Sequence, residues 1–207
     1  RQTMEAAGMG NKKQWSVALP DGVARTLVMH LESKPANRKE LEEILAWKIE
    51  RVIGHPASQL RLSRQRLSPA SGQERYLISA AREEVIAEYE ALFEALGWQV
   101  GLFLPRHLGE MQWLMWDGAA GDKMLVSGNR SGFTIVITRN REPILTRAYV
   151  CEPETRLDEL HRVAVYYRDK LAGATATLEA LLAIGGINPS EAQTVISEAI
   201  EMRPRLL

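Results

Sequence analysis

Apolar residues recur along this chain at two spacings, every second residue in some segments and every three to four residues in others. The first spacing is typical of strands and the second of helices. Strand-like alternation is most extended between residues 124 and 150, where turns at 127–132 and 139–143 separate three apolar segments. This pattern predicts a β-meander of three successive antiparallel strands.

Helical spacing recurs in five segments, which predicts helices at residues 38–53, 83–96, 105–116, 156–171 and 189–202. The first has matching end signals, because Asn37 and Glu40 are suited to cap its start and Gly54 to end it. Shorter apolar runs predict strands at residues 15–19, 24–31, 60–67, 76–81, 98–104 and 180–184. Helices and strands in this alternation indicate an α/β protein.

Two local arrangements follow from this order of elements. The helix at 38–53 is expected to pack on strands 24–31, 60–67 and 76–81, which together would form a small subdomain. The next helix, at 83–96, is expected to form a right-handed β-α-β crossover with the strands on either side of it.

Charge and residue usage narrow the possible functions. The 207 residues include 26 basic and 26 acidic side chains, so no net charge favours nucleic acid and we expect no nucleic-acid partner. The single cysteine, Cys151, and four widely separated histidines show none of the spacings of zinc sites, so no metal site is expected. No Ser-His-Asp, Cys-His or paired-carboxylate signature is visible, so we predict no catalytic residue and expect the chain not to be an enzyme.

Several short motifs, in this order of elements, resemble a known family. They are the string Val17-Ala18-Leu19-Pro20-Asp21, the glycine turn after residue 126 and the strand ending in Thr146-Arg147. They resemble the type IV pilus assembly protein PilM family, which belongs to the actin-like superfamily and is related to the cell-division protein FtsA. The resemblance implies an actin-like (ribonuclease H-like) α/β fold with an inserted strand-helix-strand-strand subdomain.

On this resemblance the chain divides into three parts. Residues 1–21 are expected to be the remnant of the first actin-like subdomain, opening on a helix tail at residues 1–10, with the N-terminal part missing. Residues 22–81 are expected to form the inserted small subdomain. Residues 82–207 are expected to form the actin-like body, with the meander and a C-terminal strand-Gly-Gly-helix turn.

The resemblance also locates a nucleotide site. In actin-like proteins two glycine-containing turns contact the nucleotide, and the matching positions here are Ser127, Gly128, Asn129, Ser131, Gly185 and Gly186. The family's turn carries an acidic residue that helps to hold a metal-bound water, and Ser127 replaces it. We therefore expect weak or absent nucleotide binding, and the cofactor that the resemblance implies is ATP with magnesium. The alternative is that both turns are ordinary connections permitted by glycine.

The resemblance implies a cytoplasmic scaffold of a type IV pilus or related secretion machine, at the inner face of the bacterial inner membrane. Its expected partner is the cytoplasmic N-terminal tail of a single-span inner-membrane pilus protein, which would bring it to the membrane, and an oligomer is compatible with this role. The tail is expected to lie in a groove between the inserted subdomain and the body, lined by Leu41, Leu45, Lys48, Arg82 and Val85. The alternatives are that these residues are packed core, or that the chain is an actin-like nucleotide-binding ATPase or filament-forming protein.

Overall fold

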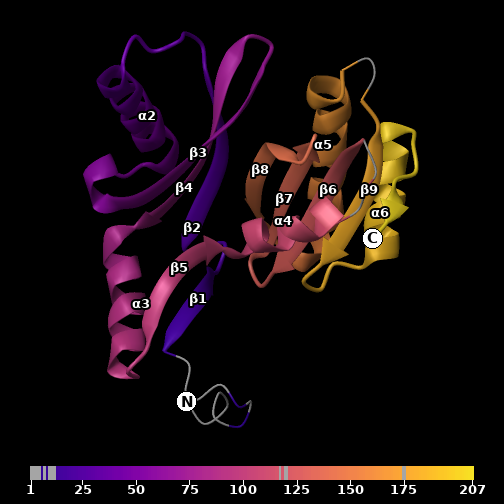
Figure 1. Cartoon of the computed structure of the whole chain (residues 1–207). Coiled ribbons are helices and arrows are strands. Elements are labelled where there is room, and N and C mark those ends of the chain that lie inside the picture. Colours follow the sequence, from indigo (N-terminus) through magenta and orange to yellow (C-terminus); the bar gives the residue numbers. More distant parts are fainter. Residues whose placement is uncertain (1–5, 7, 9–12, 117, 119–120, 174–175) are drawn as a thin grey trace.

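The computed structural model describes residues 6, 8, 13–116, 118, 121–173 and 176–207. The helix tail expected at residues 1–10 lies almost wholly outside the described residues. Three sheets and the helices packed on them make up the described part of the chain (Figure 1). The protein is therefore α/β, as its sequence predicts.

A five-stranded sheet forms the body of the protein. Its strand order is β10-β9-β6-β7-β8, and the strands are Arg205–Leu206, Leu178–Ile184, Asp122–Asn129, Gly132–Arg139 and Glu142–Val150. Each of the strands β6, β7 and β8 pairs antiparallel with the next one along the chain, which confirms the predicted meander. Strand β9 pairs parallel to β6, with Met124 opposite Leu181, as expected for the strand beside the meander.

Alternate side chains of this sheet face two different helical layers. Met124, Val126 and Ile135 lie in a core with helices α5 (Arg156–Tyr166) and α6 (Pro189–Ile200). Leu125 and Val136 point to the other face, where helix α4 (Arg106–Trp116) packs. Both faces are covered, and both sets of strand side chains are fully buried, which explains the continuous apolar run in β6.

A three-stranded antiparallel sheet forms the inserted subdomain, in the order β2 (Ala24–Leu31), β4 (Gln73–Arg82) and β3 (Leu60–Ala70). Helix α2 (Arg38–Ile53) packs on one face of it, as predicted. The helix starts where expected, because the Asn37 side chain accepts a hydrogen bond of 3.0 Å from the Glu40 amide. Figure 1 shows this sheet between α2 and the body.

The expected β-α-β crossover is wrong. Helix α3 (Glu83–Ala95) does lead from β4 to β5 (Gln99–Pro105), but β5 pairs parallel with β1 (Gln14–Leu19) in a separate two-stranded sheet. Both edges of β4 are already taken by β2 and β3, so β5 has no edge of that sheet to join. The rule for crossover handedness applies only when both strands belong to one sheet.

Candidate functional site

A network of polar side chains lies where the end of β1, the start of α4 and the end of β6 meet. We call it the polar network; it consists of the side chains of Asp21, Arg106, His107, Glu110, Ser127 and Asn129 and the backbone carbonyl of Gly128. Its members come from parts of the chain that are up to 108 residues apart. The network therefore joins the two-stranded sheet and the turn before the inserted subdomain to the five-stranded body.

Asp21 is the centre of the network. Its side chain is only 4% exposed and accepts hydrogen bonds from Arg106 Nη2 at 2.6 Å and Asn129 Nδ2 at 3.1 Å, while His107 Nδ1 lies 3.0 Å from its other oxygen. Burial by itself would raise the pKa of Asp21, but the hydrogen bonds from His107 and Arg106 outweigh it and hold that pKa well below its usual range. The carboxylate is therefore charged and fully engaged within the protein.

Glu110 occupies the space beside the predicted phosphate turn. The Ser127 hydroxyl donates a hydrogen bond of 2.5 Å to Glu110 Oε2, and Arg106 Nη1 donates one of 2.9 Å to Glu110 Oε1. Arg106 also donates to the carbonyl oxygen of Gly128 at 3.2 Å. The side chains that could contact a phosphate or its cation therefore form hydrogen bonds with groups of the protein.

Ser127, Gly128 and Gly185 are brought together, as the predicted nucleotide site requires. Strands β6 and β9 run side by side with Ser127 opposite Ile184, and the two glycines then approach so closely that a Cβ on Gly185 would lie 2.2 Å from the Gly128 carbonyl oxygen. Gly186, next in the chain, would place a Cβ in open space. The close approach is therefore between backbones, at one pair of glycines.

Asn129 and Ser131 form the tip of this region. The Asn129 side-chain oxygen accepts a hydrogen bond of 2.8 Å from the Ser131 amide, a local turn, while its amide group bonds Asp21. The turn is shorter than the predicted 127–132, because β6 continues through Asn129. Ser127 pairs with β7 on one side and β9 on the other, and Gly128 pairs with β7. This pairing keeps both residues in the strand, which local composition does not indicate.

Four members of the network, Asp21, Arg106, His107 and Glu110, were not predicted from the sequence as site residues. One local signal existed, since Arg106 and Glu110 are four residues apart on a helix and could be expected to pair. Nothing in the sequence brings α4 to Asp21 or to Ser127, because those contacts depend on how the sheets pack.

A groove of about 330 Å³ lies between the sheet of the inserted subdomain on one side and α3 and β5 on the other. One wall is β5, which pairs with β1 along one edge. The other walls come from β3, β4 and α3. Its apolar lining includes Leu62, Ala81, Ile86, Leu102 and Phe103, of which Leu62 is 39% and Leu102 50% exposed. Arg61 borders the groove and donates hydrogen bonds of 2.8 and 2.5 Å to Glu83.

The residues predicted to bind a partner do not gather in this groove. Leu45 is 3% exposed in the core under α2, and Leu41 packs against that core. Lys48 donates a hydrogen bond of 3.0 Å to the carbonyl oxygen of His30, on another side of the subdomain. Arg82 is exposed and pairs with Glu84, and Val85 is half-buried on α3. The lining of the groove comes instead from strand residues whose positions depend on sheet packing.

No group of three or more His, Cys, Asp or Glu side chains in the described part of the chain could hold a metal ion. No helix in that part is both long enough and apolar enough to cross a membrane.

Comparison with known proteins identifies the fold. No protein-family model and no curated protein matches the sequence. Among solved structures, a chain of the PilM–PilN type IV pilus biogenesis complex matches with a TM-score of 0.72 and 16% identity, over 95% of this chain and 70% of that chain. The cytoplasmic domain of EpsL, an inner-membrane component of the type II secretion system of Vibrio cholerae, matches with a TM-score of 0.55 and 13% identity, over 90% of this chain and 66% of that one.

A third match is a protein of Bacteroides thetaiotaomicron with an actin-like ATPase fold and unknown function, with a TM-score of 0.56 and 12% identity, over 100% of this chain and 74% of that chain. This chain thus spans about two thirds to three quarters of the length of these structures. The predicted actin-like fold is confirmed, and the resemblance to PilM is confirmed at the level of the fold.

Proposed function

We propose that this chain is a PilM-like scaffold of a type IV pilus or related secretion machine, rather than an enzyme. It acts at the cytoplasmic face of the inner membrane and binds the cytoplasmic N-terminal tail of a single-span membrane protein. The groove between the inserted subdomain and β5 carries this proposal. It combines exposed apolar side chains with β3 and β5, which are end strands of their sheets. An extended peptide can pair with such an edge and place alternate side chains in the apolar pockets.

The fold of the chain supports the proposal by analogy. The structures that share it include one from a pilus biogenesis complex and one from a secretion system. Fold alone does not determine function, so the proposal depends on the groove and on a binding experiment.

The first test is the affinity for the tail peptide. The probe is a fluorescent synthetic peptide with the cytoplasmic tail sequence of the single-span membrane protein encoded beside this chain. We expect it to bind the parent chain, and we expect Leu102→Glu to weaken binding about tenfold or more, because the new carboxylate would lose its hydration against apolar groove walls. Fluorescence anisotropy measures both affinities.

A matched control uses Lys48→Glu, which reverses a charge outside the groove and should leave the affinity unchanged. Absence of binding by the parent chain would remove the scaffold proposal in this form. Equal binding by the parent chain and the Leu102 variant would move the peptide site away from the groove.

The second test concerns nucleotide. We propose that the polar network occupies the position where an actin-like protein would hold a nucleotide. Its side chains there link the two-stranded sheet to the five-stranded body. Glu110, which accepts from Ser127, places negative charge beside the phosphate turn, and Arg106 is already shared between Asp21 and Glu110. Both features oppose the binding of a triphosphate.

Calorimetric titration of the chain with magnesium-ATP should therefore show little heat. The Glu110→Gln variant removes the repelling charge and retains the hydrogen-bond acceptor, so any residual affinity should increase in it. Sub-micromolar affinity of the parent chain would support the alternative, an actin-like ATPase or filament-forming protein, with Gly128, Ser131, Gly185 and Gly186 as ligand contacts.

A further inference from the structure

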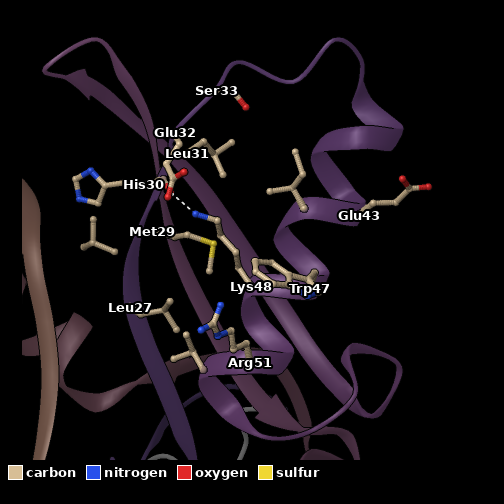
Figure 2. Close-up of a pocket in the computed structure, with 13 residues that line it drawn as sticks. Leu27, Met29, His30, Leu31, Glu32, Ser33, Glu43, Trp47, Lys48 and Arg51 are labelled. Carbon is tan, nitrogen blue, oxygen red and sulfur yellow. Dashed lines mark hydrogen bonds between the residues drawn. The ribbon is translucent and has the colours of Figure 1, made fainter.

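A second groove, of about 810 Å³, runs along the outer edge of β2 beside α2 (Figure 2). Its floor is formed by β2 residues 27–31 and its wall by α2, from Glu43 to Val52. It is separate from the groove proposed to bind the tail peptide, because the two share no lining residue. A partner in this groove would therefore cover a different surface from the one proposed for the tail peptide.

Strand β2 presents backbone groups to this groove. It is the end strand of its sheet, with β4 on one side and no strand paired on the other among the described residues. The carbonyl oxygen of His30 faces the groove, where it accepts the hydrogen bond from Lys48. Because the amide and carbonyl of one strand residue point to the same side, the backbone groups of alternate residues of β2 face this edge together with those of His30, and a strand that pairs here would take the place of Lys48 at the His30 carbonyl.

Helix α2 contributes a charged and aromatic stripe to the groove. Glu43, Trp47 and Arg51 follow one another at intervals of four residues, so they lie on one face of the helix. Trp47 is 58% exposed, and the Arg51 guanidinium lies 5.5 Å from the centre of its ring. Figure 2 shows Glu43 toward one end of the groove and Arg51 toward the other.

This stripe is complementary to itself. A two-fold axis that passes beside Trp47 reverses the order of the stripe, so Glu43 of one copy meets Arg51 of the other, and the reverse contact also forms. The same axis sets the two Trp47 rings together at the centre. In a two-fold interface each residue contact occurs twice, so both charge pairs form at once. The two β2 strands are antiparallel under such an axis, which is the direction in which adjacent edges pair readily.

We propose that the occupant of this groove is the same groove of a second copy of this chain. The three-stranded sheets of the two copies join at β2 into one six-stranded sheet, with both α2 helices on the same face. Trp47 and the 54% exposed Val52 of each copy are then covered by the other copy. An extended partner peptide would offer the edge hydrogen bonds but would not require the acidic-aromatic-basic order of α2.

The test measures the dimerisation constant of the full chain by sedimentation equilibrium. We expect a monomer–dimer equilibrium in the parent chain. Arg51→Glu should weaken it about tenfold or more, because both charge pairs become repulsive, and Glu43→Arg should weaken it similarly. Combining the two substitutions recreates both pairs in reverse and should restore the parent affinity.

The control is Glu88→Arg, a charge reversal at an exposed position of α3 outside the groove, which should leave dimerisation unchanged. A parent chain that remains monomeric up to about 100 µM would overturn the proposal. A dimer that Arg51→Glu does not weaken, or that the double substitution does not restore, would place the interface elsewhere and would overturn it equally.

Discussion

Replacing Gly185 by alanine should strongly destabilise the protein, because it adds a methyl group where the backbones of two strands approach each other. The new Cβ would lie 2.2 Å from the Gly128 carbonyl oxygen and 2.9 Å from the Gly128 backbone nitrogen, so β6 and β9 would have to separate at the end of their parallel ladder. Gly185 also has a φ of +69°, which disfavours any Cβ. Together these effects should lower the free energy of unfolding by about 3 kcal/mol or more.

Gly186→Ala separates the two causes. Gly186 also has a positive φ, +84°, but no atom lies within 4 Å of the position where its Cβ would be. This variant should therefore lose only the conformational part, about 1 kcal/mol. Urea unfolding of both variants measures the difference, and equal losses would show that the approach of the two strands is not what requires glycine at residue 185.

Asp21→Ala should cause the second large loss, because it removes the acceptor shared by Arg106, His107 and Asn129. The Asp21 side chain is only 4% exposed and that of His107 only 3%, so water cannot readily replace the missing carboxylate. Removal of one partner from a buried charge pair costs about 3–5 kcal/mol, and the loss here should lie near the lower end because the Arg106 side chain is 27% exposed. Urea unfolding at neutral pH measures this loss, and Asp158→Ala, at an exposed position of α5, serves as the control.

The same carboxylate predicts how stability depends on pH. Because the pKa of Asp21 is lower in the folded protein than in the unfolded chain, its contribution is fully present above the unfolded value of about 3.9 and is lost as the pH falls toward the folded value. The difference in stability between the parent chain and Asp21→Asn should therefore be large at pH 7 and smaller at pH 3. A difference that grows on acidification would contradict the role assigned to Asp21.

The elements of this fold that local sequence could predict are those stabilised by neighbours in the chain. The start of α2 at Asn37 and its end at Gly54 follow from hydrogen bonds that span three or four residues. The meander follows from alternation of apolar residues and from short turns between successive strands. Such interactions require no knowledge of distant segments, because every partner lies within a few residues or in the adjacent strand.

The sequence did not predict which sheet each strand joins, and the expected β-α-β crossover was wrong for this reason. The sequence around β5 predicts a strand but does not indicate that β1, more than 80 residues earlier, will be its partner. The residues expected to line the partner groove show the same limit. Leu41 and Leu45 belong to the face of α2 that packs on its sheet, and an apolar stripe that packs in a core has the same spacing as one that binds a partner. Periodicity shows that a face is apolar and leaves open what covers it.

Local patterns in the sequence are enough to predict that this chain is α/β, that residues 124–150 form a meander, and that a strand-helix-strand-strand unit precedes it. Only the packing of the sheets brings Glu110 to Ser127, with Arg106 linking Glu110 to Asp21, and brings Gly128 close to Gly185. The reason is that periodicity and capping act over a few residues, whereas a site forms where distant segments converge. Convergence depends on the packing of three sheets, whose relative positions no local pattern encodes.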